Sequence, residues 1–222
     1  GEQKMRLMLL GAPGVGKGSQ ATRIAKSLSI PHISTGDIFR FHISQGTELG
    51  MKAKQYMEKG LLVPDEVTVE IVADRLKKED CVTGFVLDGF PRTTQQAKFL
   101  DGALSEMNTQ LDMIVNIVLD DEKIVSRLTG RRVCPSCNEV YHVTDKPPAV
   151  EGICDKCNSP IVIRSDDNEK TVRDRLMVYH NQTAPLIDFY QKRVKMVNIE
   201  SNESFAVTTK MVFEAIGIER QE

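Results

Sequence analysis

The sequence predicts an α/β protein in which a parallel sheet of about five strands carries helices on both faces. Short apolar runs recur along the chain without the alternation of half-exposed strands, as expected for strands buried on both faces. Stretches with the apolar spacing of helices separate these runs. A glycine-rich string follows the first run directly, which is typical of such sheets.

The predicted strands are short segments rich in aliphatic residues. The first, "MRLMLL", ends where Gly11 interrupts the apolar pattern. Strands of this length and composition are typical of the centre of a parallel sheet. The strands are expected at residues 5–10, 31–34, 84–88, 113–119 and 196–199.

Most of the predicted helices begin with acidic residues, which are favourable there because the helix dipole is positive at its N-terminus. The apolar residues of 21–28 repeat at the spacing of one helix face. Comparable patterns follow Pro64-Asp65, Asp120-Asp121 and Asp166-Asp167.

Two stretches do not fit the alternation of strands and helices, and both are predicted to be insertions. Residues 36–63 have successive helical patterns with breaks at Gly46, Gly50 and Gly60. Residues 133–164 contain four cysteines and scattered β-branched residues without a helical period.

Composition excludes several classes of function. The formal net charge is −2, which gives no reason to expect a nucleic acid or an anionic membrane as a partner. No apolar run approaches the ~20 residues of a membrane span. We found no secretory signal pattern, so a reducing cytoplasm is the expected location.

The string "LLGAPGVGKGSQ" varies a known phosphate-binding pattern. Gly11, Gly16 and Lys17 match the pattern, but Gly18 occupies the usual hydroxyl position and Ser19 follows it. Glycines let backbone N–H groups point at phosphate oxygens, and the following helix contributes its positive end. A plain glycine turn is the alternative, but the order strand, loop, helix favours a nucleoside triphosphate site.

Several charged residues are expected at the same edge of the sheet. Asp88 ends a buried strand, where it could orient hydrated Mg²⁺. A turn at Phe90-Pro91 presents Arg92 to the same crevice. Arginines grip phosphate oxygens in pairs, and a transfer between two phosphates needs several converging cations. Four further candidates are Arg127, Arg131, Arg164 and Arg175.

With these motifs the chain resembles the adenylate kinase family over nearly its whole length. The loop is similar to that family's "GxPGxGKGTQ", with Ser19 in place of Thr. The other motifs occur in the family's order: "STGD…R" (34–40), "LVP" (62–64), "DGFPRT" (88–93), "GRR" (130–132), "VYHV" (140–143), "DD" (166–167) and "TVRDRL…Y" (171–179).

The resemblance implies reversible, Mg²⁺-dependent transfer of the terminal phosphoryl of ATP to AMP, giving two ADP, by a monomer. It implies ATP contacts at Gly14, Val15, Gly16, Lys17, Gly18, Ser19, Arg127, Val140 and Tyr141. It implies AMP contacts at Thr35, Arg40, Leu61, Leu62, Val63, Gly89, Phe90, Pro91, Arg92, Gln96, Arg164 and Arg175. The catalytic set implied is Lys17, Asp88, Arg92, Arg127, Arg131, Arg164, Arg175, Asp166 and Asp167.

The resemblance also divides the chain into three domains. Residues 1–33, 64–129 and 168–222 would form the core, 34–63 an AMP-binding domain and 130–167 a lid over ATP. Both covers would close on a site poor in water, where a phosphoryl group is transferred and not hydrolysed. A backbone contact to adenine is expected near residues 200–204, around Glu203.

Four cysteines in the predicted lid have the spacing of a metal site. "CPSC" (134–137) and "CDKC" (154–157) are separated by sixteen residues. Cys134, Cys137, Cys154 and Cys157 suit one tetrahedral, structural zinc ion. Iron is an alternative metal, and two disulfides or unconnected thiols are the alternative without a metal. The lone Cys81 is expected to be a packed thiol.

Three other functions are alternatives to ATP:AMP phosphoryl transfer. Within the same enzyme class, GTP could be the donor, or UMP or CMP the acceptor. A zinc-ribbon ATPase acting on nucleic acid would need a basic face and stacking aromatics, whereas the chain is slightly acidic and has no Trp. A nucleotide-binding scaffold without turnover would be expected to lack some of the convergent arginines. The four histidines are expected to be structural or exposed: His32, His42, His142 and His180.

Overall fold

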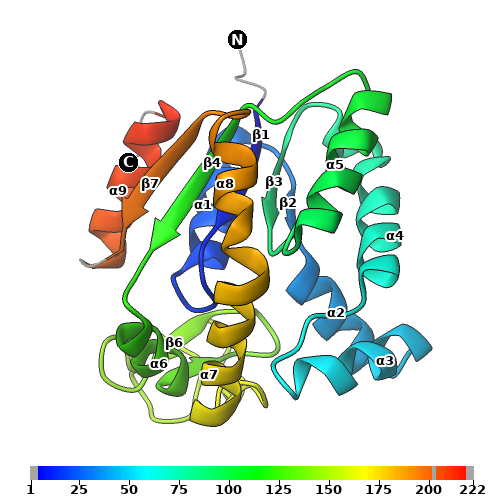
Figure 1. The fold of residues 1–222 in the computed structure, drawn as a ribbon. Helices are drawn as coiled ribbons and strands as arrows, with labels where there is room; N and C mark the ends of the chain where they lie inside the picture. Colours follow the sequence, from blue (N-terminus) through cyan, green and yellow to red (C-terminus); the bar gives the residue numbers. More distant parts are fainter. Residues whose placement is uncertain (1–4, 202–203, 219–222) are drawn as a thin grey trace.

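A five-stranded parallel sheet forms the centre of the molecule, as predicted (Figure 1). The computed structural model describes residues 5–201 and 204–218. The strand order is β2-β3-β1-β4-β7. The strands are β1 (Arg6–Leu10), β2 (His32–Ser34), β3 (Phe85–Asp88), β4 (Met113–Val118) and β7 (Met196–Glu200).

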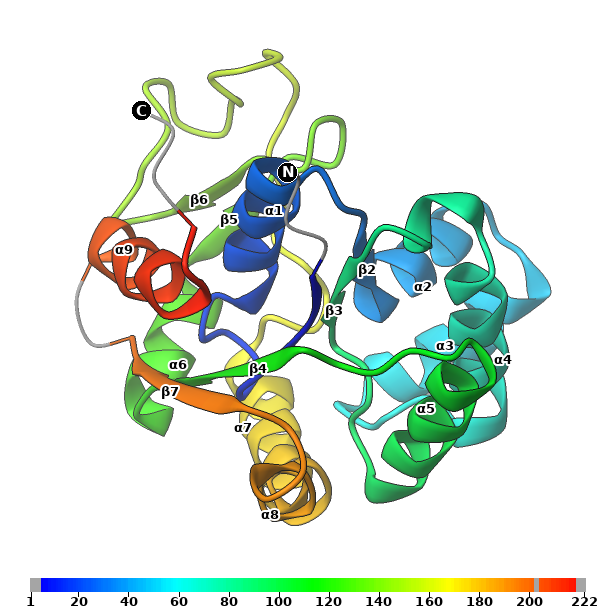
Figure 2. The same ribbon diagram turned by 90° about the horizontal axis from the view of Figure 1, so that it is seen from above.

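Helices cover both faces of this sheet (Figure 2). In β1, Leu7 and Leu9 join one buried cluster, while Met8 and Leu10 join the other. This alternation explains the continuous apolar runs, because each strand is buried on both sides. The first cluster is covered by α1 (Lys17–Leu28), α6 (Asp121–Thr129), α7 (Glu169–Val178) and α9 (Phe205–Ile216). The second is covered by α4 (Asp65–Leu76), α5 (Thr94–Glu106) and α8 (Pro185–Gln191).

The chain order around β1 creates a crevice at the carboxyl ends of the strands. From β1 the chain crosses to β2 and β3 on one side, and then passes to β4 and β7 on the other. Ligands of open α/β sheets bind where the strand order reverses in this way. The glycine-rich loop, between β1 and α1, lies at this point.

The first insertion is a pair of helices, α2 (Thr35–Ser44) and α3 (Glu48–Met57), that pack against each other. The predicted break at Gly50 is wrong, because Gly50 lies buried within α3. A Cβ atom at Gly50 would lie 2.1 Å from the His42 carbonyl oxygen, so glycine permits the close approach of the two helices. Gly46 and Gly60 do follow helix ends, with φ of 63° and 71°.

The second insertion lacks helices from residue 134 to 168, as the sequence predicted. Its strands, β5 (Arg131–Val133) and β6 (Val140–His142), form an antiparallel pair. Isolated bridges join Val133 to Val162 and Ile153 to Pro160. Its buried cluster is small, made of Cys134, Tyr141 and Cys154 with Ile161 packed against them.

One long helical column crosses the molecule from the second insertion to the sheet (Figure 1). It consists of α7, a π-helical turn η2 (Tyr179–Thr183) and α8. A short 3₁₀ turn, η1 (Glu79–Cys81), precedes β3. Among the helices of the described segments, none is both long and apolar enough to cross a membrane.

Candidate active site

A cavity of about 1180 Å³ opens at the carboxyl end of the sheet. Its wall combines the glycine-rich loop, α2, the segment after α3, the turn after β3, and parts of α6, β6 and α7. The predicted residues that line it are Gly14, Val15, Gly16, Lys17, Gly18, Ser19, Thr35, Arg40, Leu61, Leu62, Val63, Asp88, Gly89, Pro91, Arg92, Gln96, Arg127, Arg131, Val140, Tyr141, Arg164, Asp166 and Arg175. Two predicted residues, Phe90 and Asp167, lie outside this lining.

The glycine-rich loop adopts the backbone that its glycines allow. Gly11, Gly14 and Gly16 have φ of 146°, 84° and 99°, a region that side chains disfavour. At Gly14 a Cβ atom would lie 2.7 Å from Leu128 Cγ, so the loop also packs tightly on α6. Gly16 is the N-cap of α1, and the loop therefore ends at the positive end of that helix.

Lys17 is the first residue of α1 and points back over the loop. Its Nζ donates to the carbonyl oxygens of Gly11 and Ala12 at 2.8 and 2.9 Å. Burial lowers the pKa of Lys17 to about 8, and nearby arginines act in the same direction while Asp88 opposes them. A polyphosphate beside this amine would compensate its buried charge.

Asp88, at the end of β3, is buried and faces the loop. Its Oδ2 lies 3.0 Å from His32 Nε2. Burial alone would raise the pKa of Asp88, but the His32 hydrogen bond and the charges of Lys17 and Arg92 hold that pKa below its usual value. Asp88 is therefore an anionic group suited to outer contacts with a hydrated cation. His32, predicted to be structural or exposed, is part of the cavity wall through this contact.

The turn after β3 presents Arg92 to the cavity. Phe90-Pro91 is a cis peptide, and Phe90 itself packs in the second core cluster. The Arg92 backbone N–H donates to Gln96 Oε1 and its Nε to the Gly89 carbonyl, each at 2.7 Å. Burial and the neighbouring Arg175 lower the pKa of Arg92 to about 10.

The Gly89 carbonyl connects this turn to the first insertion, and the Gln96 amide connects it to the start of α4. Thr35, the first residue of α2, donates through Oγ1 to the Gly89 carbonyl at 2.8 Å. Gln96 Nε2 donates to Asp65 Oδ1 at 2.8 Å. Sequence reasoning missed Asp65 as a contact of the site, although it stands beside Pro64 at the start of α4. Arg40, also in the wall, pairs with Asp37 at 2.5 Å.

Arginines from three elements converge on the cavity from the side of the second insertion. Arg131, on β5, forms two hydrogen bonds with Asp167, at 2.7 and 2.8 Å. Arg175, on α7, pairs with Asp166 at 3.2 Å. Arg164 is not in an ion pair within the described residues, and burial together with Arg131 and Arg40 lowers its pKa to about 10. The buried Asp167 thus acts through Arg131, which explains its absence from the cavity lining.

Among the cations that line this space are Lys17, Arg92, Arg131, Arg164 and Arg175, together with the carboxylates of Asp88 and Asp166. Of these five cations, Lys17, Arg92 and Arg164 form no ion pair within 4.0 Å among the described residues. Uncompensated buried charges are unfavourable, so such a site is suited to a ligand with several negative charges. Phosphates gripped by guanidinium groups meet this requirement.

Arg127 and the chain after β7 form the outer end of the cavity. Arg127 donates to the Ser201 carbonyl at 2.9 Å and to Ser201 Oγ at 3.3 Å, and burial lowers its pKa. Ser204 and Phe205 line the same end, and the Arg23 guanidinium carbon lies 4.7 Å from the centre of the Phe205 ring. Ser201 and Ser204 flank the predicted contact near Glu203, but residues 202–203 lie outside the described part of the chain.

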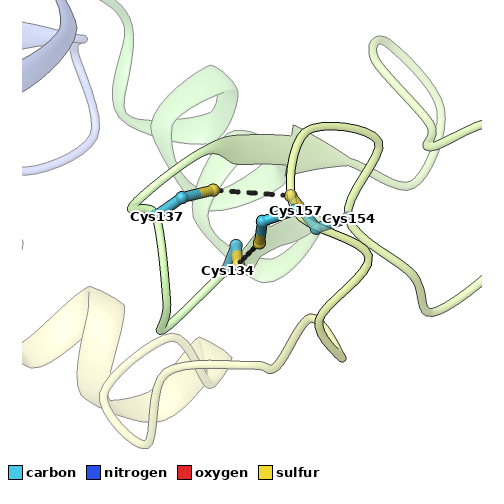
Figure 3. A group of neighbouring side chains, drawn as sticks. All are labelled: Cys134, Cys137, Cys154 and Cys157. Atoms are coloured by element: carbon cyan, nitrogen blue, oxygen red, sulfur yellow. Dashed lines mark hydrogen bonds between the residues drawn. The ribbon is translucent and has the colours of Figure 1, made fainter.

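The four cysteines of the second insertion lie together (Figure 3). All four sulfurs lie within 4.8 Å of one another, with Cys134 to Cys157 at 3.4 Å and Cys137 to Cys154 at 3.5 Å. These distances exclude disulfide bonds, which are about 2.05 Å long. Four sulfurs bound to one tetrahedral zinc lie about 3.8 Å apart, so the cluster fits such an ion.

The two cysteine pairs are folded alike. In each, an Asn follows the second Cys with positive φ, 61° at Asn138 and 58° at Asn158. Each Asn backbone N–H donates to the carbonyl of the first Cys, at 2.9 Å in both cases. The same turn on both sides brings four thiols to one point.

Tyr141 lines the cavity and also packs against the cysteine cluster. Its hydroxyl lies 3.3 Å from Cys154 Sγ and accepts from the Asp155 backbone N–H at 2.8 Å. These contacts connect β6, which is part of the cavity wall, to the second cysteine pair. The separate Cys81 is buried in the second core cluster, as expected of a packed thiol, and burial raises its pKa to about 11.

Comparison with known proteins identifies the family of this chain. Residues 9–195 match the family model for adenylate kinase. The chain is 55% identical to an adenylate kinase of Caldicellulosiruptor bescii over 215 residues, covering 97% of this chain and 100% of the relative. It is 54% identical to one from Acetivibrio thermocellus, covering 96% and 98%, and 55% identical to one from Ruminiclostridium cellulolyticum, covering 96% and 100%. The chain therefore belongs to the adenylate kinase family of phosphotransferases.

Proposed function

We propose that the central cavity transfers the terminal phosphoryl of ATP directly to AMP, giving two ADP, with the residues predicted from the sequence. The observation that carries this proposal is the convergence of Lys17, Arg92 and Arg164 on one space without a carboxylate partner among the described residues. The site needs no strong general base, because a phosphate oxygen of the acceptor is already nucleophilic.

On the donor side, the loop at residues 14–19 would bind the phosphates of ATP through its backbone N–H groups and Lys17. Arg127, held at its tip by Ser201, would pack near adenine together with the backbone of Val140 and Tyr141. The side chain of Tyr141 would have a different role, because its hydroxyl contacts Cys154 Sγ.

On the acceptor side, the turn at Gly89–Arg92 and the α2 helix would bind AMP. Thr35 and Gln96 would contact the adenine base of AMP, and residues 61–63 would cover that base. Arg40 would bind the AMP phosphate. Phe90 would contribute through packing beneath the turn and not by direct contact, since it is buried in the core.

At the transferring phosphoryl, Lys17, Arg92, Arg131, Arg164 and Arg175 would bind the oxygens on which negative charge increases. Preorganised cations of this kind provide much of the catalysis in phosphoryl transfer. Asp167 and Asp166 would orient Arg131 and Arg175. Mg²⁺ bound with ATP would neutralise charge on the outer phosphates, and Asp88 is the residue suited to orient its hydration shell.

The two insertions would act as covers. Residues 34–63 would close over AMP and 130–167 over ATP, while 1–33, 64–129 and 168–222 form the core. Support comes from the contacts of both insertions with one cavity and from the arginines that the second insertion directs at it. Zinc in the cysteine cluster would be structural, because four thiolates leave no open position for substrate. A monomer in the cytoplasm stays a prediction.

Incubation with ATP, Mg²⁺ and each nucleoside monophosphate in turn tests the assignment. ADP formed at twice the rate of AMP loss, and only with AMP, is the expected result by chromatography. Diphosphates formed equally well from UMP or CMP would overturn the acceptor assignment. Free phosphate without a gain of diphosphate would overturn the transfer itself.

A further inference from the structure

The helical column contains a π-helical turn directly beside the cavity. The Ala184 backbone N–H donates to the Tyr179 carbonyl at 2.8 Å, a bond that spans five residues instead of four. π turns are rare and are found mainly at functional sites. This one lies between α7, which carries Arg175, and α8, which packs on the sheet.

The turn marks a change in what the column packs against. Before it, Val172 and Leu176 belong to the first core cluster. After it, Leu186 and Tyr190 belong to the second. The extra residue of a π turn changes the rotation of the helix that follows, so each half can bury its own face.

Thr183, the last residue of this turn, makes a contact far from its own position in sequence. Its Oγ1 donates to the Arg92 carbonyl at 2.7 Å, across 91 residues of chain. Thr183 is 8% exposed and is part of the cavity wall. A short hydrogen bond that is partly shielded from water restricts both of its partners.

The Thr183 hydrogen bond adds a third contact to the two that already hold Arg92. The Arg92 N–H and Nε are bonded to Gln96 and Gly89, which lie within four residues of it. Thr183 supplies the contact from a distant element, and it comes from the same helical column as Arg175. The bond therefore connects the Arg92 backbone to the helical column that carries Arg175.

We propose that Thr183 is a positioning residue, which holds the Arg92 backbone so that its guanidinium and that of Arg175 face the same phosphoryl group. The proposal rests on the catalytic role proposed above for Arg92. It assigns a function to the π turn, since that turn brings the Thr183 hydroxyl to the Arg92 carbonyl.

Replacement of Thr183 by Val removes the hydroxyl and keeps the branched shape. We expect kcat to fall about tenfold, because reaction needs an arginine held in one orientation. The KM for ATP should change less than twofold, since the donor loop is not touched. Thr183→Ser should restore most of the turnover. As a matched control, Thr209→Val removes another buried hydroxyl that donates to a carbonyl, that of Phe205 at 2.9 Å, and should leave kcat unchanged.

Combination with Arg92→Ala separates positioning from general damage. If Thr183 acts through Arg92, Thr183→Val should lower kcat less than twofold in the Arg92→Ala background. A tenfold loss in that background, or normal turnover of Thr183→Val alone, would overturn the proposal. If Thr183→Val does not fold, the same cycle with Thr183→Ala decides. Normal turnover of Arg92→Ala alone would instead remove the proposed role of Arg92.

Discussion

The glycine-rich loop and the cysteine-containing insertion line one cavity but are stabilised in different ways. The loop lies between β1 and α1, above a sheet whose two faces are both buried. The insertion has a buried cluster of three residues, two of them cysteines. The first site rests on the hydrophobic core, whereas the second has little core of its own. We predict that a metal held by the four thiols stabilises the second site instead.

This difference separates the cavity from the cysteine cluster. The charged groups proposed to act on the phosphoryl come from the edge of the sheet, from α7 and from the two ends of the insertion, where Arg131 lies on β5 and Arg164 precedes α7. None of the four cysteines is part of the cavity wall. Changes at the sheet edge should therefore affect turnover, and changes at the cysteines should affect stability.

The strongest test of the sheet-anchored site is Arg92→Ala. Turnover should fall at least ~10²-fold, because one oriented charge at a transition state contributes about 3 kcal/mol. A coupled spectrophotometric assay measures kcat. Arg193→Ala is a matched control, since Arg193 pairs with Asp101 at an exposed position. Near-normal turnover of Arg92→Ala would exclude that residue from the site.

A smaller effect concerns the charge of Lys17. With its pKa lowered to about 8, Lys17 is protonated below that pH and loses its charge as pH rises through it. A bound triphosphate raises the pKa again, so binding takes up a proton near pH 8 and affinity falls at higher pH. The dissociation constant for ATP should increase up to about tenfold between pH 7 and 9.

Calorimetry in buffers of different ionisation enthalpy measures this proton uptake. Lys17→Arg provides the control, because a guanidinium keeps its charge over this range. Proton uptake that persists in Lys17→Arg would assign the titration to another group.

The smallest effect on turnover is expected from Cys157→Ser or from chelation of the metal. A structural zinc can contribute on the order of ten kcal/mol to such a module, so the unfolding temperature should fall markedly. Turnover near 25 °C should change little, because the thiols do not reach the cavity. Differential scanning calorimetry and the coupled assay give the two values. An equal loss of activity with unchanged unfolding would contradict the structural role.

Much of the fold could be predicted because its signals are local. All five strands of the central sheet occur where the sequence has apolar runs, since burial on both faces leaves a continuous apolar pattern. The glycine-rich loop was predicted from its motif between a strand and a helix, and the structure places it there. The cysteine pairs were predicted from their spacing, and the structure brings all four thiols together. Gly50 was misread as a helix break, because sequence cannot distinguish a glycine that ends a helix from one that lets two helices approach.

Contacts between residues far apart in the sequence could not be predicted. The His32 bond to Asp88 and the Asp65 bond to Gln96 join residues 56 and 31 positions apart. Phe90 was expected at the AMP site on the strength of its motif, but it packs beneath the turn. Motifs identify the segment that forms a site, and packing decides which way each side chain in it points.

The order of elements, the glycine-rich loop, the spacing of the cysteines and the family can all be recognised from the sequence. These properties depend on neighbouring residues, whose periodicity and spacing are local. Which arginines pair with carboxylates, and which face the cavity without them, is set by the packing of distant segments. The same packing decides that Tyr141 reaches a cysteine and that Thr183 reaches the turn at Arg92. Charge pairing and long-range hydrogen bonds arise when distant segments pack together, and no local pattern encodes them.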